Sequence, residues 1–266
     1  MAEQNVLTAI EDGVAYVTLN RPESLNGIDL DMVEQLVAAA ESLKDDQQIR
    51  AVILRGEGRS FCAGLDFASA FKDKKRVARF FLAGPRKANL FQKFSTVWRD
   101  LPVPVIAVVH GHCFGGGLQL VAGADFRFTT PDAQWSILEA KWGLVPDMGG
   151  TVPFLDVMPV DIVQRLAMTG EIVSGEQAVE LGLATGVSDD PLAESLALVE
   201  QIKERSPDSV AATKQLIYRN TRGSERRALR RERKLQSLMF KSPNTKIARE
   251  AGMKKQSPVF GPRTFG

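Results

Sequence analysis

Residues His110–Leu120 read HGHCFGGGLQL, and this stretch determines how the middle of the chain folds. It follows an apolar run, Val103–Val109, that is typical of a buried strand. The glycines Gly115–Gly117 allow a turn with no Cβ in the way, and Leu118–Ala122 begins a helix. The turn therefore leaves backbone N–H groups at a helix N-terminus. Such groups bind negative oxygen, either a phosphate or the developing oxyanion of a carbonyl. A turn that serves packing alone is the alternative.

The composition is typical of a soluble globular protein. Of the 266 residues, 44% are hydrophobic and 25% are charged, so the chain is long and apolar enough to bury a large core. The net charge of +2 favours neither nucleic acid nor a membrane surface as a partner. Residues Met1–Asn5 show no signal-peptide pattern, and no apolar run approaches transmembrane length.

The histidines and cysteines predict neither a metal site nor a catalytic thiol. His110 and His112 lie two residues apart with no acidic residue beside them, so we expect no metal. Cys62 and Cys113 lie beside glycine turns and are interpreted as small buried side chains. Two cysteines fit a reduced, cytoplasmic setting.

Strands and helices alternate along the first 190 residues. Val6–Ile10 and Val14–Leu19 flank a turn with a glycine, which predicts a hairpin. Asp29 predicts the N-cap of a helix, because apolar residues recur after it at helical spacing. Further strands are predicted over Ala51–Leu54 and Phe126–Thr129. The alternation favours the α/β class.

From about Pro191 the sequence predicts helices alone, over Leu192–Arg205, Ser209–Arg219 and Ser224–Phe240. We therefore divide the chain into an α/β core over residues 1–190, which holds the functional site, and a helical region over residues 191–266. A basic cluster lies in the helical region: Arg219, Arg222, Arg226, Arg227, Arg230, Arg231, Arg233 and Lys234. It favours a solvated helix face or subunit contacts over RNA binding, since no RNA-binding motif accompanies it.

Several motifs recur in a fixed order. CAGLD at Cys62–Asp66 comes first, then the glycines of the opening stretch, then AQW at Ala133–Trp135 with Glu139, then GLVPDMGGT at Gly143–Thr151. This order and spacing resemble the crotonase family of enoyl-CoA hydratases and isomerases, from about residue 6 to residue 260. The resemblance implies a crotonase-like spiral of β-β-α turns. It also implies a C-terminal helical trimerisation region, and hence a homotrimer or homohexamer.

The resemblance further implies chemistry on an acyl-CoA thioester. The backbone amides of Leu65 and Gly116 would stabilise an enolate oxygen. Glu139 would be the acid/base, and its apolar neighbourhood would raise its pKa. The family's second carboxylate position is Gln119 here, and a glutamine takes up no proton at neutral pH. Asp147 stands where the dienoyl-CoA isomerase subgroup has an aspartate near the reacting end of the acyl chain. A turn aspartate or a helix N-cap is the alternative for Asp147.

The substrate is expected to bring its own coenzyme A, with no permanently bound cofactor. The resemblance assigns coenzyme A binding to segments whose backbone groups do much of the work: Leu25, Asn26, Gly27, Ala63, Gly64 and Asp66, with Lys255 and Phe260 reaching across a subunit boundary. An ordinary turn is the alternative for Asn26 and Gly27. Aromatic residues such as Phe67 are dense between Asp66 and Asp100, and some are expected to line an acyl pocket.

The leading hypothesis is therefore an enzyme that shifts a double bond of an enoyl- or dienoyl-CoA. Gln119 favours this reaction over hydration of a 2-enoyl-CoA, because hydration must activate a water as well as move a proton. Decarboxylation, thioester hydrolysis and carbon–carbon cleavage on the same fold stay open. A homologue of another class, which binds coenzyme A or RNA without catalysis, is the remaining alternative.

Overall fold

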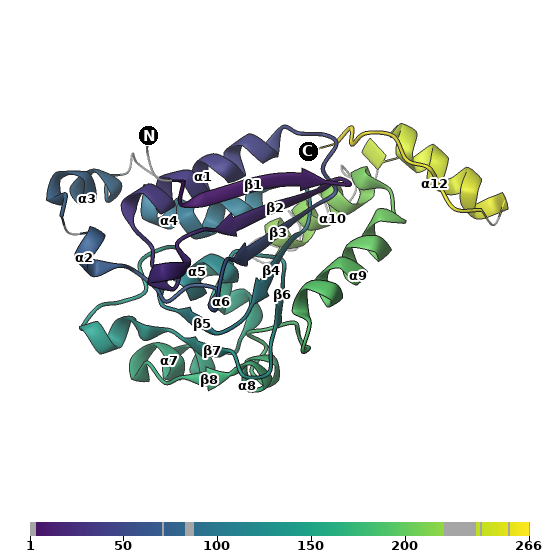
Figure 1. Cartoon of the computed structure of the whole chain (residues 1–266). Coiled ribbons are helices and arrows are strands. Elements are labelled where there is room, and N and C mark those ends of the chain that lie inside the picture. Colours follow the sequence, from purple (N-terminus) through teal and green to yellow (C-terminus); the bar gives the residue numbers. More distant parts are fainter. Residues whose placement is uncertain are drawn as a thin grey trace.

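The computed structural model describes residues 4–70, 72–82, 88–220, 238–239, 241–254 and 256–265. A six-stranded sheet with the order β1-β2-β3-β4-β6-β9 forms its centre (Figure 1). The strands are β1 (Val6–Glu11), β2 (Val14–Leu19), β3 (Ala51–Gly56), β4 (Val105–Val109), β6 (Phe126–Thr129) and β9 (Gly186–Val187). The first pair is the antiparallel hairpin that the sequence predicted, and the other pairs are parallel.

A second, three-stranded sheet consists of β5 (His112–Phe114), β7 (Gln134–Ser136) and β8 (Val173–Ser174). Its β5 follows β4 closely along the chain and leads into helix α5, so the pairing of β5 in this small sheet fixes the chain just before the glycine stretch. The helices before it are α1 (Leu30–Lys44), α2 (Phe67–Ala70), α3 (Lys74–Phe80), α4 (Leu90–Thr96), and the 3-10 turns η1 (Pro22–Ser24) and η2 (Val97–Asp100). Those from the glycines onward are α5 (Gly116–Ala122), η3 (Leu138–Trp142), α6 (Thr151–Val157), α7 (Val160–Thr169) and α8 (Gly175–Glu180).

The inner strands β3 and β4 are covered on both faces of the sheet, whereas most of the edge strand β1 is exposed. Alternate residues of a strand point to opposite faces. Val52 and Leu54 of β3 belong to the main core, which helices α1 and α4 cover. Ala51 and Ile53 of the same strand belong to a smaller core with Val199 of helix α9 (Pro191–Lys203). This explains the continuous apolar runs from which the strands were predicted.

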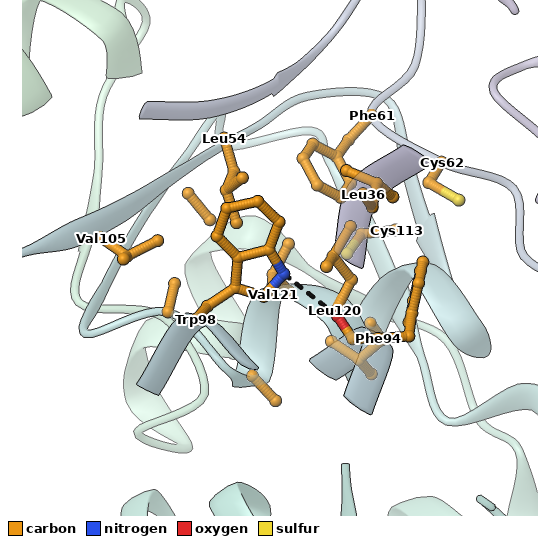
Figure 2. Close-up of a cluster of buried hydrophobic side chains, with 14 of the residues drawn as sticks. Leu36, Leu54, Phe61, Cys62, Phe94, Trp98, Val105, Cys113, Leu120 and Val121 are labelled. Carbon is orange, nitrogen blue, oxygen red and sulfur yellow. Dashed lines mark hydrogen bonds between the residues drawn. The ribbon is translucent and has the colours of Figure 1, made fainter. Parts of the chain in front are cut away.

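Most of the local features that the sequence predicted are present in the structure. The Asp29 carboxylate caps α1 by accepting a hydrogen bond of 2.7 Å from the Met32 amide. Strand β4 begins after Pro104 rather than at Val103, because proline has no N–H to donate to a ladder. The fully buried Trp98 packs among Leu54, Val105 and Val121 of the main core, and its indole N–H donates to the Phe94 carbonyl (Figure 2).

Beyond residue 190 the described residues form helices and no strands. They are α9, α10 (Pro207–Asn220) and α12 (Pro243–Lys254), and Figure 1 shows α12 extending away from the sheet. Buried Asp208 ties the chain end to α10, since it accepts hydrogen bonds from the amides of Thr264 and Phe265. Most of the helix predicted over Ser224–Phe240 and, apart from Arg219, the whole basic cluster lie outside the described residues. None of the described helices combines the length and the apolar character needed to cross a bilayer.

Candidate active site

A short ladder between two cysteines holds two glycine turns side by side. Cys62 and Cys113 are bridge partners: the Cys62 amide donates to the His112 carbonyl at 2.8 Å, and the Phe114 amide donates to the Cys62 carbonyl at 3.0 Å. Both thiols are buried and free, and Figure 2 shows them in the main core. Burial raises the pKa of the Cys62 thiol to about 12, so it stays protonated. Gly117 packs against Cys62 so closely that a Cβ there would lie 2.6 Å from the Cys62 Cβ.

The Leu65 amide is directed away from the strand-like contacts of its neighbours. Leu65 bridges Ile28 in parallel: the Ile28 amide donates to the Gly64 carbonyl at 2.8 Å, and the Asp66 amide donates to the Ile28 carbonyl at 2.9 Å. In this pattern the residue between the two bonds turns its own N–H to the other side. Within the described residues the Leu65 N–H has no acceptor. Gly64 makes the turn possible with a φ of +96°.

The Gly116 amide lies in the first turn of α5, where helix N–H groups have no intrahelical acceptor. Gly115 precedes it with a φ of +49°, and the Gln119 amide donates to the Gly115 carbonyl at 2.9 Å to begin the helix. No acceptor for the Gly116 N–H occurs among the residues that the structure describes. The two amides predicted to form an oxyanion site thus both lack a partner.

Both turns line one cavity of about 110 Å³. Its apolar wall comes from Phe67, Leu138, Trp142, Leu144 and Met148, and the rings of Phe67 and Trp142 lie 5.2 Å apart. Its polar groups are the two glycine turns and the carboxyl groups of Glu139 and Asp147; among the described residues, no lysine, arginine or histidine lines it. The cavity therefore combines backbone donors, two carboxylates and an apolar wall, which suits an apolar acyl group attached to a polarised carbonyl.

Glu139 lies in η3 with its two carboxylate oxygens in different surroundings. Oε1 accepts a hydrogen bond of 2.6 Å from the Gln119 side-chain amide, whereas Oε2 is buried with no hydrogen-bond partner among the described residues. Burial raises the pKa of Glu139 above its ordinary value, and the charge of Asp147 adds to this rise. Hydrogen bonds from its own backbone amide and from Gln119 act in the opposite direction. A carboxyl group of raised pKa with one unoccupied oxygen is suited to general acid/base work.

Gln119 is fully buried and does not line the cavity. Its Oε1 accepts hydrogen bonds from the amides of Met148 at 2.8 Å and Gly150 at 3.0 Å, while its Nε2 donates to Glu139. Gln119 therefore lies behind Glu139 and touches the carboxylate and the following loop rather than the cavity.

Asp147 is exposed and is one of the residues that line the cavity. Burial of the carboxyl group raises its pKa above the ordinary value. The N-cap alternative is wrong, because α6 begins only at Thr151 and its N-cap is Gly150.

The predicted coenzyme A segments meet beside the cavity. The Ala63 amide donates to the Leu25 carbonyl at 2.9 Å, and Ala63 and Gly64 also line the cavity. The Asn26 side chain is used inside the fold: its Nδ2 donates to the carbonyls of Glu57 and Ser60 and its Oδ1 accepts from the Arg21 amide. Its backbone is used there as well: the Asn26 amide donates to the Arg21 carbonyl at 2.9 Å, and the Asn26 carbonyl accepts from the Cys62 thiol at 3.1 Å. Asn26 is fully buried, so it holds the turn together and does not face a ligand, as the sequence had predicted it would.

Arg21 joins two of these segments, and this contact was not predicted from the sequence. Its guanidinium donates to the Gly27 carbonyl and lies 3.3 Å from the Asp66 carboxylate and 3.5 Å from that of Asp29. Phe260 lies elsewhere, with the Arg50 guanidinium 5.9 Å from its ring centre. Lys255 lies outside the described residues.

Comparisons with known proteins agree with this geometry. The family model described as Enoyl-CoA hydratase/isomerase matches residues 9–263. Among relatives, a peroxisomal Delta(3,5)-Delta(2,4)-dienoyl-CoA isomerase of Arabidopsis thaliana is 30% identical over 262 residues, covering 94% of this chain and 93% of that protein. A carnitinyl-CoA dehydratase of Salmonella typhi is 36% identical over 211 residues, covering 78% and 77%.

The solved structure of an enoyl-CoA hydratase from Mycobacterium smegmatis superposes with a TM-score of 0.85 at 28% identity, covering 97% of this chain and 99% of that one. The match of the family model extends over nearly the whole chain and includes both glycine turns, Glu139 and Asp147. The chain therefore belongs to the enoyl-CoA hydratase/isomerase family, also called the crotonase family.

Proposed function

We propose that this chain shifts a carbon–carbon double bond of an enoyl- or dienoyl-CoA. In this reaction a base removes a proton from carbon next to the polarised system, and the thioester carbonyl becomes an enolate oxygen. The free amides of Leu65 and Gly116 would hold that oxygen. Glu139 would take the proton and return it to another carbon. The thioester supplies its own coenzyme A, so the proposal needs no bound cofactor.

The position of Gln119 is the observation that carries this proposal. Hydration must activate a water and also move a proton, whereas isomerisation needs only a base that returns what it takes. Gln119 uses both acceptor positions of its carbonyl oxygen on loop amides and does not line the cavity, so it has no access to a substrate water. Glu139 and Asp147 are the titratable groups of the lining.

Hydration of a 2-enoyl-CoA is the second candidate, and two observations favour it. Asp147 provides a second carboxyl group at the cavity, and relatives of this chain include proteins named as a hydratase and as dehydratases. The third alternative is a protein that binds coenzyme A or RNA without catalysis. The two unpartnered amides and the raised pKa of Glu139 argue against it.

The test is a panel of acyl-CoA thioesters given to the full chain: a 3-enoyl-CoA, a dienoyl-CoA and crotonyl-CoA. Absorbance follows the conjugation of the double bond, and mass spectrometry separates isomerisation, which leaves the mass unchanged, from hydration, which adds one water. We expect isomerisation of the 3-enoyl or dienoyl thioester. Efficient hydration of crotonyl-CoA without any double-bond shift would favour the second candidate.

We further propose that residues 1–190 carry the site and that the helical region over residues 191–266 packs against neighbouring subunits, giving a homotrimer or homohexamer. In support, α12 extends away from the sheet, and Met253 and Val259 near it are 75% and 86% exposed (Figure 1). Phe260 does not line the cavity of its own chain. In such an assembly, Lys255 and Phe260 of one subunit would contact the coenzyme A that is bound by a neighbouring subunit.

A further inference from the structure

We infer that Gln119 is a positioning residue, which fixes the orientation of the Glu139 carboxylate and couples it to the loop that carries Asp147. The inference rests on the proposed role of Glu139 as the acid/base.

Gln119 itself is immobilised from several sides. Its backbone lies in α5, and its main-chain carbonyl accepts a hydrogen bond of 2.5 Å from the Ser95 hydroxyl. Its side chain packs under Gly150, where an added Cβ would lie 2.5 Å from the Gln119 Cγ. The side chain therefore has little freedom to rotate, and its hydrogen bonds are made from a rigid base.

The two loop amides determine which way the Gln119 side chain is turned. Oε1 accepts from Met148 and Gly150, so the NH₂ group is the part that faces Glu139. Glutamine is suited to this place because one end of its amide accepts while the other donates. An ionised glutamate at residue 119 would accept the hydrogen bonds of the two loop amides, but it would place a second negative charge beside Glu139. An apolar side chain would neither accept from the loop amides nor donate to Glu139.

The consequence is a division between the two oxygens of Glu139. Oε1 is occupied by Gln119, and Oε2 is left to accept a proton. Burial raises the pKa of Glu139, and the negative charge of Asp147 raises it further, whereas the hydrogen bond from Gln119 lowers it. Because a base works only when it is ionised, loss of the Gln119 bond should move the acid side of the activity profile to higher pH.

The experiment compares Gln119→Met, which keeps the length but makes no hydrogen bonds, with Gln119→Glu, which keeps both bonds to the loop. For the reaction that the wild-type chain catalyses, kcat and KM are measured across pH. The lost bond is made to a charged group, so we expect kcat of the methionine variant to fall about 10- to 100-fold at neutral pH, equivalent to about 1.4–2.7 kcal/mol of activation free energy. KM should change less than about threefold.

Both variants should show the acid limb of kcat at higher pH than the wild type. The shift should be larger for Gln119→Glu, since two carboxyl groups this close share one proton. Gln177→Met is the matched control: it removes the hydrogen bond that the amide of Ser174, the N-cap of α8, donates to the Gln177 side chain, and it should leave the profile unchanged. The glutamate variant keeps the loop bonds, so it remains informative if the methionine variant does not fold.

An unchanged acid limb in the folded variants would overturn the positioning role, even if kcat falls, because a merely structural defect lowers activity at all pH values alike. This outcome is distinct from failure of the proposed function: a wild-type chain that hydrates rather than isomerises still needs an ionised Glu139, and its hydration profile would test the same coupling.

Discussion

The Glu139→Gln substitution tests the acid/base assignment with little disturbance of the fold. The new side chain has the same shape, and its carbonyl oxygen can accept the hydrogen bond that Gln119 now donates to Glu139 Oε1. What is lost is the ability to take up a proton. General acid/base catalysis contributes about 10²- to 10⁴-fold, so kcat should fall by that factor, equivalent to about 2.7–5.4 kcal/mol of activation free energy.

Stability provides the control for this variant. Burial raises the pKa of Glu139 in the folded state above its pKa in the unfolded chain. The Glu139 carboxyl group therefore adds to the free energy of unfolding fully only when pH is below its unfolded-state pKa, and this contribution is lost as pH rises through its folded-state pKa. At neutral pH the substitution thus removes an unfavourable buried charge, while it adds a buried N–H near the Oε2 position, which costs about 1–3 kcal/mol if unpaired. The two effects oppose each other, so Tm at neutral pH should change little, and the wild type should gain relative to the variant as pH falls.

The assay is double-bond isomerisation of the best substrate of the panel, with KM as the measure of thioester binding. We expect KM to stay within about threefold while kcat falls, because the contact is used in the transition state rather than in binding. A folded variant that keeps more than one-tenth of wild-type kcat would refute the assignment of Glu139 as the base.

Three further predictions concern the rest of the site and the assembly. Gly116→Pro removes the N–H at a helix position where proline is tolerated, and it should lower kcat about 10²- to 10³-fold. Gly116→Ala keeps the N–H, and its new Cβ must displace two side-chain ends, the Met148 sulfur at 2.8 Å and the Ile28 Cδ1 at 2.9 Å, so it should lose less; equal losses in folded variants would exclude the amide as the donor. In the part of the chain that the structure describes, the cavity is lined by two carboxyl groups and by no cationic side chain. A 3-enoyl-CoA with a carboxylate on its acyl chain should therefore react more than about tenfold more slowly than a neutral one, and Asp147→Asn should reduce the difference. Light scattering should show a trimer or hexamer, and a stable monomer at micromolar concentration would contradict the proposed assembly.

The sequence was sufficient for the parts of the fold that follow from local patterns. The strand over Phe126–Thr129 and the helix capped by Asp29 came from apolar spacing and a capping side chain, and both are confirmed. The short strands β7 and β8 were not predicted, because two or three residues are too few to show a period.

The site was less predictable where it depends on contacts between distant residues. Gln119 stands at the family's second carboxylate position, but its side chain accepts hydrogen bonds from amides 29 and 31 residues further along the chain. Asp147 was weighed as an N-cap because a helix follows, yet the helix begins four residues later. Such long-range hydrogen bonds and exact helix starts leave no periodic signal in the sequence.

The cysteine ladder has a consequence for how reactions can change on this scaffold. The amides of Leu65 and Gly116 belong to turns joined by main-chain bonds through Cys62. Glu139, Trp142, Leu144, Asp147 and Met148, in contrast, all come from one stretch of ten residues. Under the proposed function, the amides that would stabilise charge on the thioester are thus built separately from the carboxyl groups that would move protons and from most of the wall that would contact the acyl group. Substitutions in that single stretch can redirect the chemistry or the substrate while the carbonyl-binding frame stays in place.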